Sequence, residues 1–330
     1  MRRHGLTFGL AIVVAVAACQ PGGAGSVDDA LRAADRAMAD LRMSIEDVTR
    51  ATAFRYRVRD DRGQWMGPMQ IIRIPEASTF AATYFTWSDE DEAFHAHLAT
   101  SDDLLDWKWR VELAARASMP TIAPASDGGY VVAWEQEPDP IHNVVAYFES
   151  WEVLLSGRPT RRFDVPVTMP ACGEGTPSIE SASSTAVTIG FHYHASCERD
   201  LQAVGTTDWS SWTASQRREI DAALIAQGVV GHIGDRDRIT YRGVDVMLIE
   251  GETVSGEWGS WRSFLYDVAS GSAQRLAIRT HAGSQAFSNG TLDLVEIEGR
   301  EALLVTMYLF TEGARGEEDG ELIYYRFVEP

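Results

Sequence analysis

The chain has 330 residues, enough for one large all-β domain or two ordinary domains. Its formal net charge is −19, and such an acidic surface repels phosphate backbones, which argues against nucleic acid as a partner. Since it contains no glycine-rich phosphate loop, nucleophile elbow or metalloprotease helix, we expect neither a nucleotide cofactor nor cofactor-dependent redox chemistry.

Residues 1–18 have the layout of a secretory signal. Arg2 and Arg3 form a basic start, and the apolar run that follows is shorter than the roughly 20 residues of a membrane span. Its end, Val16-Ala17-Ala18-Cys19, resembles the lipobox of bacterial lipoproteins, in which the cysteine is lipidated and becomes the new N-terminus. The alternative is an ordinary cleaved signal with an incidental cysteine.

The lipobox resemblance implies a protein held to a membrane of the bacterial envelope through Cys19, outside the cytoplasm. Residues 19–26 are rich in glycine and would form a flexible tether. Gln20 is not the aspartate linked to inner-membrane retention, so the analogy favours the outer membrane or a periplasm-facing site. Cleavage would also remove Arg2 and Arg3 and take the net charge to −21.

Residues 27–50 are predicted to form an amphipathic helix. Ser26 can cap its N-terminus, and Asp28 and Asp29 suit its first turn. Apolar side chains recur at steps of three and four on one helix face: Val27, Leu31, Ala34, Met38, Leu41, Ile45 and Val48. This spacing also fits a short coiled coil, but we expect the face to pack against the following domain.

Residues 54–330 show a β-rich pattern that repeats. Five strongly apolar strands recur at roughly 50–60 residues, the range of repeat architectures. They are Phe80 to Trp87, Tyr130 to Gln136, Ala186 to His194, Val244 to Glu250 and Ala302 to Phe310. A further strand follows each of them: Phe94 to Ser101, Asn143 to Ser150, Asp200 to Thr207, Trp261 to Val268 and Glu321 to Phe327.

The repeat predicts an all-β, five-bladed β-propeller. A single small sheet cannot bury both of its faces, so neighbouring units must stack and the ring must close. Strand Phe54 to Val58 would pair with the last unit and complete that closure. A β-sandwich, or two β-domains with accidental spacing, is the alternative.

A local motif points to a known group of propellers. Residues 101–107 read Ser-x-Asp-Leu-x-x-Trp, and residues 206–212 repeat the Asp-to-Trp spacing. The motif resembles the turn between outer strands in the five-bladed glycosidases of the arabinanase, xylosidase and invertase group. The aspartate can bind turn amides while the tryptophan packs between blades, so the motif indicates fold and not active site.

In that group an axial funnel holds a catalytic Asp from each of the first two blades and an acid Glu from the third. Glu174, in Glu174-Gly175-Thr176-Pro177, resembles this acid and is our candidate, although a solvated loop glutamate is the alternative. The other positions read Met66-Gly67-Pro68-Met69-Gln70 and Met119-Pro120-Thr121 and supply no carboxylate. The standard pair of carboxylates is therefore incomplete.

Other residues are candidates for the funnel. Asp235 follows the expected fourth inner strand and is a second catalytic candidate. Candidate ligand-binding residues are Glu135, His192, His194 and His281. A histidine pair on one strand face is more commonly structural than functional.

Cysteine usage agrees with export. With Cys19 assigned to lipid, Cys172 and Cys197 remain and most simply form a disulfide. Zinc bound by Cys197 with His192 and His194 is the alternative, but it lacks Cys-x-x-Cys spacing, so we predict no metal site. Two acidic stretches could hold calcium, at 88–92 and 317–321, but they lack EF-hand spacing.

These observations predict a membrane-tethered propeller that binds a carbohydrate or another envelope ligand in its funnel without standard glycosidase catalysis. The alternatives are an active glycoside hydrolase that uses Glu174, and a scaffold that binds other envelope proteins. The ten Trp, ten Tyr and twelve Phe suit both strands and sugar-stacking surfaces.

Overall fold

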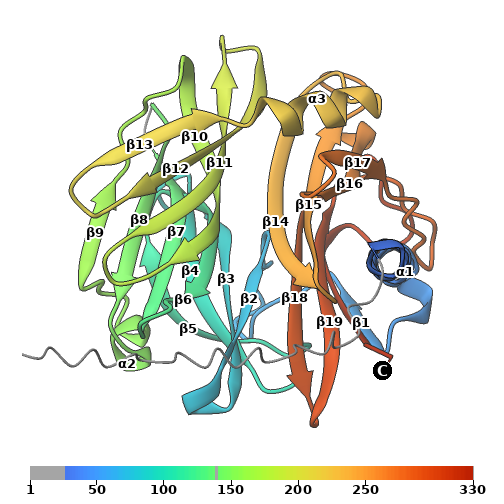
Figure 1. Cartoon of the computed structure of the whole chain (residues 1–330). Helices are drawn as coiled ribbons and strands as arrows, with labels where there is room; N and C mark the ends of the chain where they lie inside the picture. Colours follow the sequence, from blue (N-terminus) through green and yellow to red (C-terminus); the bar gives the residue numbers. More distant parts are fainter. Residues whose placement is uncertain (1–26, 138–139, 330) are drawn as a thin grey trace, which may run out of the picture.

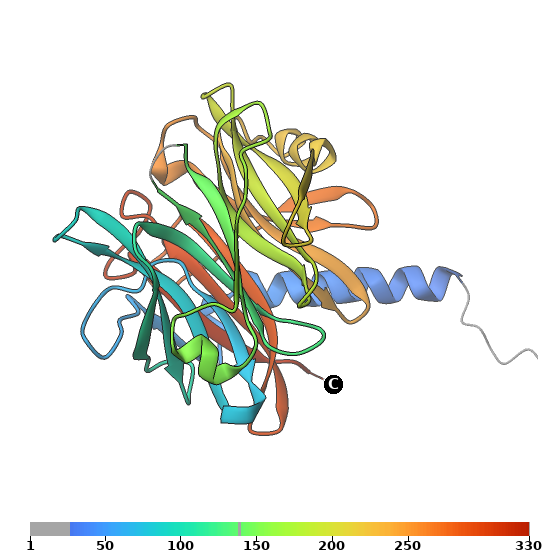
Figure 2. The same ribbon diagram turned by 90° about the vertical axis from the view of Figure 1, so that its left-hand side faces the viewer.

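The computed structural model describes residues 27–137 and 140–329. Cys19, the predicted signal and the tether lie outside these residues. Twenty strands form five antiparallel four-stranded sheets around a common axis, which confirms the predicted five-bladed propeller (Figures 1 and 2).

Each blade runs outward from an inner strand. The inner strands are β2 (Gln70–Ile74), β6 (Ala117–Pro124), β10 (Ala171–Ala182), β14 (Ile233–Tyr241) and β18 (Phe287–Ile297). The second strands are β3 (Thr79–Ser88), β7 (Tyr130–Gln136), β11 (Val187–Ala195), β15 (Val244–Glu252) and β19 (Arg300–Leu309). The third strands are β4 (Ala93–Ser101), β8 (His142–Phe148), β12 (Arg199–Thr207), β16 (Trp261–Asp267) and β20 (Gly320–Phe327).

The outermost strands are β5 (Lys108–Ala114), β9 (Arg161–Asp164), β13 (Trp212–Gln216), β17 (Ser272–Arg275) and β1 (Ala53–Tyr56). Strand β1 completes the fifth blade by pairing antiparallel with β20, with Phe54 opposite Tyr324. The first strand of the ring therefore closes it on the last blade, as the repeat predicts, and the two ends of the domain hold each other.

The apolar second strands form the core because neighbouring blades cover both of their faces. In β3 the side chains from Thr79 to Thr86 are all buried. Trp107 of the turn motif is buried among residues of the first and fifth blades, and its indole N–H donates to the carbonyl of Leu104 at 3.1 Å. Asp103 accepts the amides of Leu105 and Asp106 at 2.9 and 2.8 Å. The motif is therefore structural, as its sequence indicates.

Helix α1 (Val27–Glu46) docks on the ring mainly through its second half. Leu41 and Ile45 are fully buried against the fourth and fifth blades, and Tyr324 donates its hydroxyl to the carbonyl of Ile45 at 2.7 Å. The predicted packing of the apolar face against the domain therefore holds for this half, whereas the start of the helix projects from the ring and Leu31 is 60% exposed (Figure 2).

The remaining helical segments are short. They are η1 (Val48–Arg50), η2 (Pro75–Ala77), α2 (Trp151–Leu155), α3 (Arg218–Ala226) and η3 (Trp258–Ser260). Among the described residues, no helix combines the length and apolar character needed to span a bilayer.

Cys172 and Cys197 form the predicted disulfide; their Cα atoms are 5.4 Å apart, and the two cysteines are 25 positions apart in sequence. The bond links the start of β10 to the turn after β11. Because Cys197 is in this bond, it is not a zinc ligand, so the zinc alternative in its predicted form is wrong.

Candidate functional site

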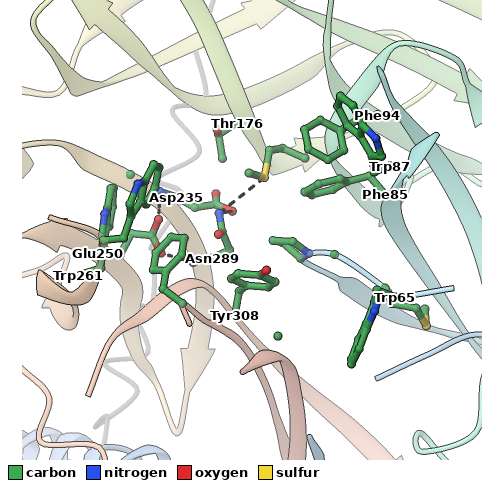
Figure 3. Close-up of a pocket in the computed structure, with 18 of the residues that line it drawn as sticks. Trp65, Phe85, Trp87, Phe94, Thr176, Asp235, Glu250, Trp261, Asn289 and Tyr308 are labelled. Atoms are coloured by element: carbon green, nitrogen blue, oxygen red, sulfur yellow. Dashed lines mark hydrogen bonds between the residues drawn. The ribbon is translucent and has the colours of Figure 1, made fainter. Parts of the chain in front are cut away.

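A cavity of about 650 Å³ opens at one end of the propeller axis, and residues from all five blades line it (Figure 3). This volume lies within the roughly 300–1,000 Å³ that is typical of small-molecule sites.

β-bulges in the inner strands position the floor of the cavity. The strand register shifts between Ser118 and Thr121, between Gly175 and Ser178, and between Ser288 and Thr291. The residues placed there with positive φ, near 48°, are Met119, Thr176 and Asn289, and all three line the cavity. A positive φ costs a non-glycine residue on the order of 1–2 kcal/mol and is most unusual for a β-branched threonine, so these bulges have the character of functional sites.

The fourth blade supplies the acidic part of the floor. Its inner strand shifts register between Ile233 and Arg236, and this irregularity contains Asp235. Glu250, from the adjacent strand β15, accepts the amide of Asp235 at 3.2 Å and also accepts the amide of Asn289. The Asn289 side-chain nitrogen lies 3.5 Å from Asp235 Oδ2 and 3.7 Å from the Met119 sulfur, so three blades meet at one point.

The two carboxyl groups of this floor hold protons unusually tightly. Burial raises the pKa of Asp235 to about 7, and the charge of Asp237 adds to the effect. Burial also raises the pKa of Glu250 well above its usual range, with a further contribution from Asp235. At neutral pH the floor can therefore donate as well as accept hydrogen bonds.

Two groups of aromatic side chains face each other across the floor. One comes from the first blade and the segment before it and comprises Trp65, Phe85, Trp87 and Phe94. The other comes from the fourth and fifth blades and comprises Trp258, Trp261, Tyr308 and Phe310. Figure 3 shows Phe85, Trp87 and Phe94 on the opposite side of the cavity from Trp261.

The aromatic groups are ordered by their own contacts yet remain open to solvent. Ring centroids of Trp87 and Phe94 lie 5.0 Å apart, and those of Trp258 and Phe310 lie 4.9 Å apart. Trp65, Trp87 and Trp258 are nevertheless 45%, 50% and 55% exposed. Large exposed aromatic surfaces around a cavity are typical of binding sites.

The third blade contributes a polar wall of Thr176, His192 and Asp200. Glu135, from the second blade, accepts the amide of Thr176 at 3.0 Å and the hydroxyl of Ser118 at 3.3 Å. Burial raises the pKa of Glu135. Glu135 thus stabilises the backbone of the bulge at Thr176 and is a positioning residue.

Glu174 does not line the cavity. Its side chain is fully buried, and its Oε1 accepts the amides of Thr168 and Met169 at 2.7 and 2.6 Å. The bulge directs Thr176, two residues later, toward the axis instead. These contacts give Glu174 a structural role, since a general acid must reach the bond that it protonates.

The other predicted residues divide between the cavity and the periphery. Asp235 and His192 line the cavity, although Asp235 lies within β14 and not after an inner strand. His194 lies beside it and contacts Asp200. His281 is far from the axis: its ring stacks on Phe54 of the outermost strand β1, with centroids 4.2 Å apart, so its expected axial position is wrong.

Sequence reasoning missed several lining residues, above all Glu250, Asn289 and Asp200. Glu250 ends the apolar strand predicted from sequence, Val244 to Glu250, and a carboxylate at the end of an apolar run is expected to face solvent, whereas β15 continues to Glu252 and Glu250 is buried. Asn289 occupies the position in the bulge of β18 that Met119 occupies in β6 and Thr176 in β10. An alignment of the inner strands with one another would therefore have identified it.

No protein-family model matches the chain, and no curated protein sequence matches it. Solved structures do. The catalytic domain of a Coprinopsis cinerea GH62 α-L-arabinofuranosidase aligns with a TM-score of 0.53 and 10% identity over 82% of this chain and 95% of that one.

Two further enzymes align similarly. A Podospora anserina α-L-arabinofuranosidase in complex with cellotriose gives a TM-score of 0.52 and 12% identity over 84% of this chain and 96% of that one. A Penicillium chrysogenum α-L-arabinanase complexed with arabinobiose gives a TM-score of 0.50 and 10% identity over 84% of this chain and 98% of that one. The chain thus shares its five-bladed propeller fold with glycoside hydrolases, as the turn motif indicates.

Proposed function

We propose that the protein binds a carbohydrate in its axial cavity. The observation that carries this proposal is the pair of aromatic groups facing each other across a floor of Asp235, Glu250 and Asn289. Aromatic rings stack on the apolar faces of sugar rings, while carboxyl and amide groups bind the hydroxyls around their edges. The neighbouring structures with arabinobiose and cellotriose support the same class of ligand.

The floor supports binding more than standard glycoside hydrolysis. In the resembling glycosidases the first three blades supply the catalytic carboxylates, whereas the bulges of the second and third blades here direct Met119 and Thr176 to the cavity. The two carboxyl groups of the floor, Asp235 and Glu250, are neighbours on one blade. Hydrolysis requires carboxyl groups on both sides of the glycosidic bond.

The proposal includes a location. Cys19 would carry lipid and hold the propeller to a membrane of the cell envelope, and α1 would lie between tether and ring. A carbohydrate of the envelope or its surroundings is then the ligand within reach. The support for this part is the lipobox resemblance of residues 16–19.

A glycan array followed by an assay for released reducing sugar tests the proposal. We expect saturable binding to a subset of glycans with no sugar released from them. Absence of binding to every glycan would contradict the carbohydrate proposal, and release of sugar would replace it with hydrolysis.

Hydrolysis is the second candidate because of one observation. Asp235 lines the cavity with a pKa of about 7, which suits a general acid. Asp200 and Asp319 are carboxylates that line the cavity from other blades and could act opposite to it. If sugar is released, Asp235→Asn should abolish release, whereas Glu174→Gln should retain it in any variant that still folds.

A further inference from the structure

Beside the cavity, at the junction of the third and fourth blades, one carboxylate lies between two imidazoles. His194 is the penultimate residue of β11, Asp200 lies opposite it in the register of β12, and His232 directly precedes β14. His194 Nδ1 is 2.9 Å from Asp200 Oδ1, and His232 Nδ1 is 2.8 Å from Asp200 Oδ2. The two imidazole rings are nearly parallel, with centroids 5.7 Å apart and an interplanar angle of 7°.

The hydrogen bonds of His232 are incompatible with a single protonation state. The backbone N–H of Asp200 points at His232 Nδ1 from 3.1 Å, which requires a bare nitrogen, while Asp200 Oδ2 at 2.8 Å requires a protonated one. An imidazole nitrogen has only one in-plane position for a proton or a lone pair. A cation bound by the nitrogen and the carboxylate would bridge the bare nitrogen and the oxygen, and the N–H of Asp200 would then need another acceptor.

We propose that His194, Asp200 and His232 bind a divalent first-row transition-metal ion of the zinc class. One ligand atom from each residue lies within 4.8 Å of the others, close enough to share one ion. Two imidazole nitrogens and one carboxylate oxygen form a donor set typical of such ions, and three protein ligands leave a coordination position open. This proposal does not depend on the carbohydrate proposal.

The surroundings suit entry and use of the ion. The side chains of His194, Asp200 and His232 are 35%, 18% and 26% exposed, so the ion can enter from solvent. Asp200 also lines the cavity, as does His192, whose Nε2 lies 3.9 Å from Asp200 Oδ1. The ion would therefore lie in the wall of the cavity, where its open position could take a water or a ligand oxygen.

His95 provides a matched control. It lies between two carboxylates, 2.9 Å from Asp91 in the turn before β4 and 3.0 Å from Glu112 on β5, and is likewise part of a histidine–carboxylate cluster. It belongs to the first blade, and among the described residues His95 is the one histidine paired with these two carboxylates. A surface histidine with acidic neighbours is thus present in both clusters, but the two-imidazole donor set is confined to one of them.

Calorimetric titration of the full chain with ZnCl2 tests the proposal. The chain should carry no histidine tag, be stripped of metal with a chelator, and be kept non-reducing so that Cys172 and Cys197 stay bonded. We expect one ion per chain, an affinity reduced by about tenfold or more in His194→Gln and in His232→Gln, and no change in His95→Gln. Circular dichroism identifies any variant that fails to fold.

Cobalt spectroscopy gives a second readout that misfolding does not imitate. Co²⁺ added to the folded wild-type chain should give visible absorption bands that are lost in folded His194→Gln and kept in His95→Gln. Absence of binding to the wild type, equal binding in folded His194→Gln and His232→Gln, or loss in His95→Gln would overturn the proposal.

Discussion

Glu250 Oε1 accepts a hydrogen bond from the backbone N–H of Asp235 at 3.2 Å, so two carboxyl groups lie side by side on the floor of the cavity. Burial raises the pKa of both groups; the charge of Asp235 adds to the effect at Glu250, and the charge of Asp237 adds to it at Asp235. An axial floor that carries such a pair remains protonated in part at neutral pH and can donate hydrogen bonds to a ligand.

This arrangement predicts a stability that falls as pH rises. The pKa of Asp235 is about 7 in the folded chain and about 4 in an unfolded one, so its proton stabilises the fold fully below pH 4 and not above pH 7. Because the side chain of Asp235→Asn cannot ionise, the variant should raise the free energy of unfolding at pH 8 by about 4 kcal/mol relative to its effect at pH 4.

Urea unfolding of wild type and Asp235→Asn at several pH values between 4 and 8 checks this prediction. The variant should retain part of the slope, because burial also raises the pKa of Asp237 to about 6 and that of Asp293 to about 7. Parallel curves for the two proteins would contradict the assignment.

The docking of α1 predicts that substituting two leucines of one helix face changes the free energy of unfolding by very different amounts. Leu41 is fully buried against the ring, so Leu41→Ala should lower the free energy of unfolding by about 3 kcal/mol. Leu31 is 60% exposed, and Leu31→Ala should change it by less than about 0.5 kcal/mol. Equal effects in a denaturant titration would mean that the first half of the helix packs against the ring as well.

The lipobox resemblance predicts the location of the protein. Cys19→Ala should move it from the membrane fraction to the soluble fraction of a bacterial host, because one lipid-modified residue is the proposed attachment. Fractionation followed by immunoblotting measures this change. Unchanged partition between the fractions would refute the anchor.

The ring could be predicted from the sequence because the pattern of strands that defines a blade occurs five times. Five apolar strands at a regular spacing, such as Tyr130–Gln136, define five sheets that must stack, and small errors at strand ends do not alter that outcome. The turn at Asp103 and Trp107 likewise depends on residues close together in sequence.

The site was less predictable because it depends on single-residue shifts and on distant pairs. The bulge of β10 directs Thr176 to the axis and leaves Glu174 buried, although the two are only two residues apart. His232 reaches Asp200 across a blade junction, 32 residues away, and no local pattern marks such a contact. His281 precedes the fifth blade in sequence but contacts its outermost strand.

Calorimetric titration of the best oligosaccharide from the array tests the central proposal most directly. It should compare wild type, Trp258→Ala in the cavity, and Phe54→Ala, an exposed aromatic on the outermost strand. We predict one binding site per chain, an affinity lowered about tenfold by Trp258→Ala, and no change with Phe54→Ala. Equal affinity in wild type and Trp258→Ala, or a loss confined to Phe54→Ala, would contradict binding between the aromatic groups.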